Sequence, residues 1–187
     1  WYRYHHLFAD VMANRLQRFY PDQINELHLR AANWFKQKHL FTECIEHALA
    51  ANDYLLAADI VESQSMDLLK LGSLSTLMGW LEKLPPEIIN ERPELGVVSA
   101  WVYLLTGKLD QAEDSLSAAE NYLDSLDKPD ELRGQITAIR TYAAAQLGHL
   151  DQAIDLAHTA FELLAQDNLT VRCVVAFVLG GVYYMQQ

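Results

Sequence analysis

Gly107-Lys108-Leu109-Asp110-Gln111-Ala112 and Gly148-His149-Leu150-Asp151-Gln152-Ala153 are two copies of one pattern, G-x-L-D-Q-A, 41 residues apart. Each copy lies between two stretches with helical spacing of apolar residues. A glycine can end the first helix, an aspartate can cap the second, and a small alanine lets the two helices approach closely. The pattern therefore predicts a tight turn between two paired helices.

Two weaker copies of the pattern lie upstream. They are Gly72-Ser73-Leu74 and His39-Leu40-Phe41-Thr42-Glu43-Cys44. Predicted turns then begin at residues 39, 72, 107 and 148, at spacings of 33, 35 and 41 residues. Tetratricopeptide repeats have a period of about 34 residues. We therefore expect an all-α chain, in which antiparallel helix pairs stack into a right-handed tetratricopeptide-like superhelix.

The helical periodicity also predicts where the elements lie. Pro85-Pro86 and Pro93 are expected to break the chain after Leu84. Strand alternation is absent from the sequence, with the possible exception of residues 1–4. Helices are expected near 6–19, 23–38, 42–51, 53–65, 74–83, 94–106, 109–124, 131–147, 150–166 and 170–186.

Composition limits the function classes. The 187 residues carry a net charge of −11, and residues 41–187 hold eight Lys and Arg against 22 Asp and Glu. An acidic body of this kind is a poor partner for nucleic acid. No run of about 18 apolar residues predicts a membrane helix. Cys44 and Cys173 lie in apolar helical patterns, which favours reduced core thiols and a cytoplasmic location.

Five segments of the N-terminal half carry a family resemblance. They are Trp1-Tyr2-Arg3-Tyr4-His5-His6-Leu7-Phe8-Ala9-Asp10, Leu27-His28-Leu29-Arg30-Ala31-Ala32-Asn33-Trp34-Phe35, Glu43-Cys44-Ile45-Glu46-His47-Ala48-Leu49-Ala50-Ala51-Asn52-Asp53, Trp80-Leu81-Glu82-Lys83-Leu84-Pro85 and Arg92-Pro93-Glu94-Leu95. In order and spacing they resemble MalT-like, LuxR-type transcriptional activators, which belong to the STAND class of signal-transduction ATPases. Cys44 and Asn52 depart from the family's usual Ala and Gly.

The resemblance implies that the chain consists of three parts. Residues 1–20 would be the end of a winged-helix segment, 21–93 a helical linker arm, and 94–187 sensor repeats truncated in mid-repeat. In such proteins an ATPase module that binds ATP or ADP precedes the arm, and a helix-turn-helix domain that binds DNA follows the repeats. This chain has no phosphate loop, because Val102 stands where the first Gly before Gly107-Lys108 is required. We expect no cofactor, no catalytic residue and no direct nucleic-acid or membrane contact in this chain.

The sequence near its C-terminal end is interpreted as the first helix of another repeat. Phe177, Gly181 and Tyr184 match its large, small and aromatic positions, and the next turn is expected about one residue beyond Gln187. The partner is expected to be a small-molecule inducer or a protein. The alternative is a generic tetratricopeptide scaffold that binds only protein partners.

His5 is the candidate nucleotide sensor that the resemblance implies. In STAND proteins a winged-helix histidine inside an apolar-His motif contacts a nucleotide phosphate, and Tyr4-His5-His6-Leu7 fits that motif. Imidazole titrates near neutral pH, which suits this role. The alternative is a structural histidine at a strand end.

Four residues are candidates for a ligand groove. Trp101 and Tyr142 fall on the helix face expected to line it, and Arg140 and Gln146 flank Tyr142. Such a set suits a sugar-like or small polar ligand, whereas ordinary packing or solvation is the alternative. Arg140 is expected either to pair with an acidic residue or to reach the groove. The remaining spaced aromatics are expected in the core: Trp34, Phe35, Tyr103 and Tyr184.

Metal and acid–base chemistry are not predicted. Cys44 and His47 share a helix face near His39, but no second ligand pair accompanies them. The acidic pairs Glu113-Asp114 and Asp124-Asp127 are interpreted as solvated helix faces.

Overall fold

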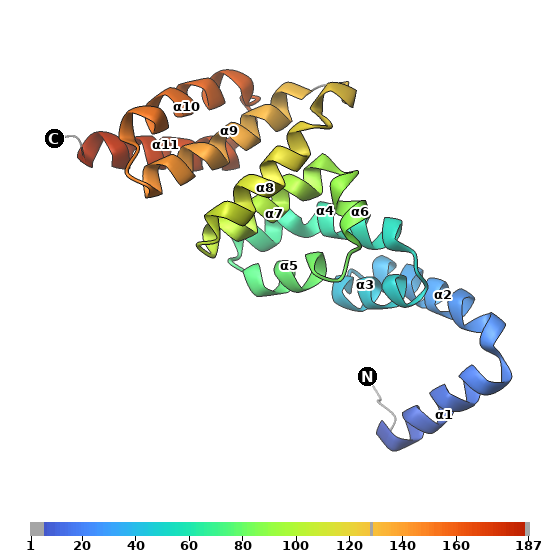
Figure 1. The fold of residues 1–187 in the computed structure, drawn as a ribbon. Helices are drawn as coiled ribbons and strands as arrows, with labels where there is room; N and C mark the ends of the chain where they lie inside the picture. Colours follow the sequence, from blue (N-terminus) through green and yellow to red (C-terminus); the bar gives the residue numbers. More distant parts are fainter. Residues whose placement is uncertain (1–5, 128, 186–187) are drawn as a thin grey trace. The chain divides into compact units, whose positions relative to one another are not determined.

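The computed structural model describes residues 6–127 and 129–185, and every element within them is helical (Figure 1). The all-α fold class is thereby confirmed. The helices are α1 (His6–Phe19), η1 (Pro21–Gln23), α2 (Ile24–Gln37), α3 (Phe41–Ala50), α4 (Tyr54–Lys70), α5 (Leu74–Leu81), α6 (Pro86–Asn90), α7 (Pro93–Leu105), α8 (Leu109–Glu120), η2 (Leu123–Ser125), α9 (Pro129–Gln146), α10 (Leu150–Leu163) and α11 (Leu169–Met185).

The chain forms two compact units, residues Trp1–Ile60 and Val61–Gln187. The division falls inside α4. In the first unit, α2 packs against α3 and buries Ala32, Cys44 and Ile45 between them. The division of the sequence at 20 and 93 stays a prediction.

All four predicted turns are present, and each begins with a residue in the left-handed region. The positive φ angles are 57° at His39, 68° at Gly72, 77° at Gly107 and 78° at Gly148. Asn52, which stands where the resembled family has Gly, also has a positive φ, of 58°. Glycine and asparagine adopt this conformation at least cost.

These turns share one hydrogen-bond pattern. The amide of Gly107 donates to the carbonyl of Leu104, and the amide of Lys108 donates to that of Tyr103, at 3.1 and 2.8 Å. The amides of Gly148 and His149 bond in the same way to Ala145 and Ala144. This is the Schellman motif, which satisfies the last carbonyls of a helix.

The expected aspartate caps are wrong. Lys108 and His149 are the N-cap residues of α8 and α10, and neither makes a side-chain cap hydrogen bond. Asp110 and Asp151 lie inside the first turn instead, because the helix begins at the preceding leucine. There a carboxylate still favours the positive end of the helix dipole.

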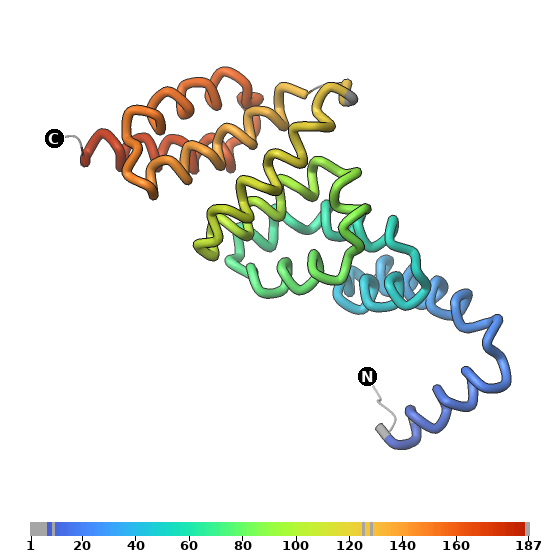
Figure 2. The backbone as a smooth tube through the Cα atoms, in the orientation of Figure 1, coloured from blue at the N-terminus to red at the C-terminus, as the bar shows by residue number. Residues whose placement is uncertain are grey.

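Small residues lie where the helices of the second unit approach closely. Figure 2 shows the backbones of these helices. α7 packs against α8, α9 packs against α10, and α11 packs against both α9 and α10. Ala112 and Ala153, the last residues of the two G-x-L-D-Q-A copies, are 3% and 1% exposed. A Cβ added at Gly96 of α7 would lie 3.1 Å from the Cβ of Ala119 in α8. The alanines therefore act as the sequence predicted.

One helix was not anticipated. α6 (Pro86–Asn90) begins directly at the Pro85-Pro86 pair that was expected only to break the chain. Proline is favoured at the first helical position, because its missing N–H has no helical partner there. The same preference starts α7 at Pro93 and α9 at Pro129.

Three expected core side chains are exposed instead. Cys173 is exposed, whereas Cys44 is fully buried. Trp34 and Tyr184 are 44% and 79% exposed. The buried stripe of α11 is Val171, Val175, Val178 and Val182. Cys173 and Tyr184 each stand two residues from a member of that stripe, which is about 200° around a helix.

Candidate ligand-binding hollow

A hollow of about 390 Å³ lies in the second unit, among the first helices of successive repeats and the end of α4. Its walls are almost entirely apolar or aromatic. The lining residues are Met66, Leu69, Lys70, Trp101, Leu105, Tyr142, Thr170, Val171, Cys173, Val174 and Phe177. Ligand sites of small molecules are typically concave, of about this volume, and apolar with few polar groups.

The repeat pattern explains which side chains meet there. Met66, Trp101 and Tyr142 each stand six residues before a turn glycine, at Gly72, Gly107 and Gly148. Lys70 and Leu105 stand two residues before the first two of those glycines, one helical turn further along the same face. Equivalent positions of successive helices therefore converge on one hollow.

Trp101 is a buried part of the wall of the hollow. Its side chain is 6% exposed, and it belongs to the core cluster of α7 to α11. Its indole Nε1 is the single buried side-chain nitrogen or oxygen without a hydrogen-bond partner in the described part of the chain. A buried donor left unpaired costs about 1 to 3 kcal/mol. Tyr142 is half-buried and lines the same hollow.

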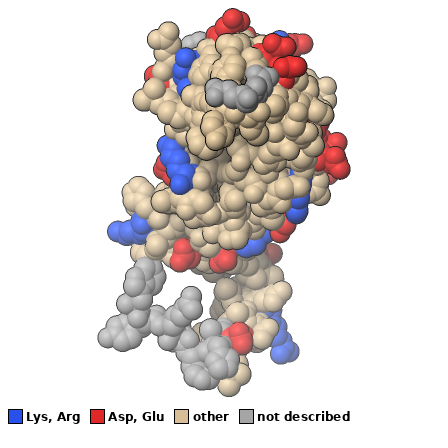
Figure 3. Space-filling view, turned by 90° about the vertical axis from the view of Figure 1, so that its left-hand side faces the viewer, with Lys and Arg blue, Asp and Glu red and all other residues tan. Residues whose placement is uncertain are grey.

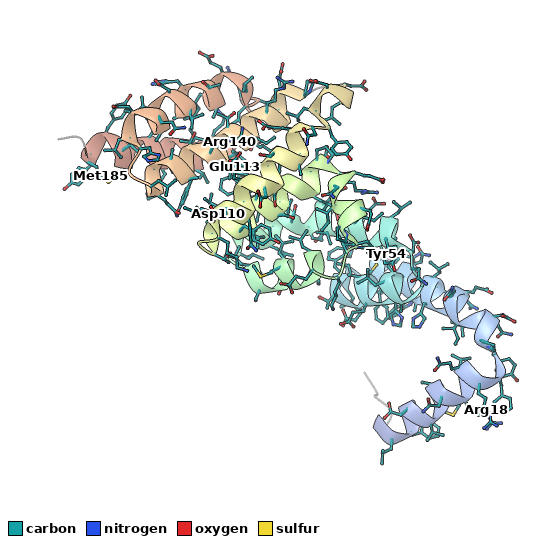
Figure 4. The ribbon with its side chains drawn as sticks, viewed as in Figure 1. Arg18, Tyr54, Asp110, Glu113, Arg140 and Met185 are labelled. Atoms are coloured by element: carbon teal, nitrogen blue, oxygen red, sulfur yellow. The ribbon has the colours of Figure 1, made fainter. Side chains whose placement is uncertain are left out.

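Arg140 lies elsewhere. Its Nε and Nη2 donate to Glu113 of α8 at 3.1 and 2.5 Å, and its Nη1 and Nη2 donate to Glu120 at 2.6 and 2.9 Å. Figure 4 shows Arg140 beside Glu113. These hydrogen bonds, first to Glu120 and then to Glu113, raise the pKa of the guanidinium. Of the two options for Arg140, pairing with acidic residues is the one observed.

The predicted groove residues are thus brought together only in part. Trp101 and Tyr142 share the hollow, whereas Arg140 borders a separate one of about 370 Å³ with Glu113 and His149. Gln146 is exposed and lines neither. His5 lies outside the described residues.

Several lining residues were missed from the sequence, above all Met66, Lys70 and Phe177. Counting back from the turn glycines would have found the first two, since they occupy the positions of Trp101 and Leu105 in the preceding repeat. Phe177 had been matched only to the large position of a repeat's first helix, and it is 81% exposed at the edge of the hollow. On the face of the molecule that Figure 3 shows, residues other than Lys, Arg, Asp and Glu form most of the surface.

Residues 6–127 and 129–185 contain no group of three or more His, Cys, Asp or Glu placed to hold a metal ion. None of the helices in these ranges is both long and apolar enough to cross a bilayer.

Comparison with known proteins finds relatives of a single kind among the most similar. Over 160 residues the chain is 31% identical to the serine/threonine-protein kinase PknK of Mycobacterium tuberculosis, in strains CDC 1551 / Oshkosh and ATCC 25618 / H37Rv, and of Mycobacterium bovis. The match covers 83% of this chain but only 14% of each relative. The chain is therefore homologous to one segment of a much longer protein.

No sequence profile of a protein family matches the chain. No solved structure matches it either.

Proposed function

We propose that this chain is the sensing and relay region of a larger regulatory protein, and that it binds an inducer in the hollow lined by Trp101 and Tyr142. The chain itself is not the catalytic part. The observation that carries the proposal is the hollow's position, since α4, α7, α9 and α11 all contribute to its walls. A ligand there contacts consecutive repeats at once.

The relay follows from that geometry. A ligand shifts a conformational equilibrium only by its difference in affinity between the two states. Because the walls come from separate repeats, a small change in the rotation between repeats alters the hollow. Occupancy therefore favours one inter-repeat packing over others, and this packing is the signal passed along the array.

Two kinds of output domain are supported. The resemblance to MalT-like regulators favours an ATPase, which would bind ATP or ADP through residues that include His5, and a DNA-binding domain. The relatives' name favours a protein kinase, of which a segment like this chain forms 14%. Both place the effector chemistry elsewhere in the parent protein. In both cases the chain acts as a soluble cytoplasmic sensor, and with the ATPase output the parent would belong to the STAND class.

The experiment is a thermal-shift screen of a metabolite library on the 187-residue chain and on two variants. Cys173→Phe places a ring at the wall of the hollow from an exposed position, and Ala176→Phe is the matched control on the same helix, exposed but outside the lining. We expect compounds that stabilise the wild type and Ala176→Phe but not Cys173→Phe. If every stabilising compound stabilises all three proteins equally, or if no compound stabilises the wild type, the proposal is wrong. The alternative, a scaffold that binds only protein partners, would then hold.

A further inference from the structure

The chemistry of the walls narrows the ligand class beyond what the sequence suggested. Sugars present many hydroxyl groups, and each one buried without a partner costs free energy. The groups expected to meet those hydroxyls, Arg140 and Gln146, do not line the hollow. What remains is an apolar surface of leucine, valine, methionine and aromatic side chains, which favours a hydrocarbon or aromatic body.

One charged side chain stands at this apolar surface. Among the described residues that line the hollow, Lys70 is the only Lys, Arg, Asp or Glu. Positive charge is scarce around it, because residues 41–187 hold just eight Lys and Arg. The side chain of Lys70 is 49% exposed, and its ammonium lies 3.8 Å from the carboxylate of Asp67, whose own side chain is 74% exposed. A ligand carboxylate can therefore replace a distant, solvated partner with a closer one.

Trp101 contributes its apolar ring, and not its N–H donor, to the wall of the hollow. Its Nε1 is buried without a partner among the described residues, so protein atoms enclose it. Lys70 is a donor without acceptor capacity. The charged group of the wall thus calls for an acceptor on the ligand.

We infer that the hollow binds a small monocarboxylate with an aliphatic or aromatic body, whose carboxylate meets Lys70 and whose body packs on Met66, Trp101 and Phe177. This inference rests on the proposed function and assigns its ligand class. The unbranched thioether of Met66 and the exposed ring of Phe177 adapt readily to such a body. The ligand is a free small molecule.

The test measures binding of a homologous series to the 187-residue chain by titration calorimetry. The probes are hexanoate, octanoate and decanoate below their micelle concentrations, with octanol as the neutral match for octanoate and maltose as the sugar. We expect saturable binding of one octanoate per chain. Each added methylene should tighten binding about fourfold until the hollow is full. Octanol should bind about threefold more weakly than octanoate, the size expected for a half-exposed ion pair.

Variants locate the binding. Lys70→Met should abolish the preference for octanoate over octanol, whereas Lys108→Met, which removes an exposed lysine outside the lining, should keep it. Cys173→Phe should lower octanoate affinity at least tenfold, and Ala176→Phe should not. Circular dichroism verifies that each variant is folded.

Two results overturn the inference, and they are distinguishable. In the first result, octanoate does not bind, or its binding does not depend on Lys70, but Cys173→Phe still prevents the binding of a compound from the screen. The ligand class is then wrong and the sensing function stands. If neither octanoate nor any screened compound depends on the hollow, the proposed function falls as well.

Discussion

At the residue scale, two glycines inside helices, Gly134 and Gly180, differ from the turn glycines because neither has a positive φ. A Cβ at Gly134 of α9 would lie 2.9 Å from the Cγ and 3.0 Å from the backbone nitrogen of Leu164, closer than side chains tolerate. At Gly180 of α11 nothing lies within 4 Å. Both glycines have helical backbones. A difference in stability between their alanine variants therefore reports packing and not helix propensity.

We therefore expect opposite effects of the same substitution. Gly134→Ala should lower the free energy of unfolding by about 1 to 3 kcal/mol through overpacking. Gly180→Ala should raise it by up to about 1 kcal/mol, since alanine is the better helix former. Urea unfolding followed by circular dichroism measures both. Equal changes in the two variants would show that the α9 contact does not limit residue size.

A histidine pair gives the first unit a pH dependence. The Nδ1 atoms of His28 and His47 lie 2.8 Å apart, and Phe35 stacks on the His47 ring at 5.3 Å. Burial, and then the charge of His28, lower the pKa of His47 below its ordinary value of 6.5. The unfolded chain therefore binds more protons than the folded one between the lowered pKa and 6.5. The free energy of unfolding falls as the pH is lowered through that window and is regained as the pH rises.

The prediction concerns the exchange of α3 amides. Hydrogen–deuterium exchange, corrected for its intrinsic pH dependence, should show less protection of α3 at about pH 5.5 than at about pH 7.5. His47→Gln should reduce this difference, and His158→Gln, on the exposed face of α10, should leave it unchanged. Protection that does not change with pH in the wild type would contradict the assignment.

At the element scale, ion pairs connect α8 and η2 to α9. Arg140 bridges Glu113 and Glu120 with its side chain 28% exposed, whereas Arg133 reaches Asp124 with the two side chains 46% and 93% exposed. The first arginine separates two carboxylates that would otherwise repel each other. The second makes a solvated pair of the kind that contributes little.

Arg140→Gln should therefore cost more stability than Arg133→Gln. We expect a loss of about 1 kcal/mol for the first and at most a few tenths for the second. The difference should shrink between about 0.1 and about 1 M NaCl, since salt screens the exposed carboxylates. Urea unfolding at both salt concentrations is the measurement. Equal losses for the two variants at low salt would mean that the ion pairs of Arg140 contribute no more stability than that of Arg133.

At the scale of the whole molecule, charge sets the expected partners. The chain carries a net charge of −11, and residues 41–187 carry 8 − 22 = −14. Non-specific DNA binding depends on clustered Lys and Arg that displace counterions. The isolated chain should therefore not bind a labelled DNA duplex at about 0.15 M salt, as measured by fluorescence anisotropy. Micromolar affinity under these conditions would assign to this chain a role that we place in another domain.

Local chemistry is what the sequence by itself determined about this protein. Turn residues and helical periodicity act over a few neighbours, so the four turns near 39, 72, 107 and 148 and nearly all helices were predictable. The small residues at Ala112 and Ala153 were predictable for the same reason. The short helix α6 was missed because a proline pair was taken only as a break.

Only the tertiary structure decided where side chains meet. Arg140 and Tyr142 are two residues apart on α9, yet one pairs with α8 and the other lines the hollow, because two residues turn a helix by about 200°. The exposure of Cys173 and Tyr184 depends on which stripe of α11 packs on α9 and α10. Lys70 reaches the hollow because α4, α7 and α9 present equivalent positions to one another. That meeting depends on the rotation between repeats, which no local pattern in the sequence encodes.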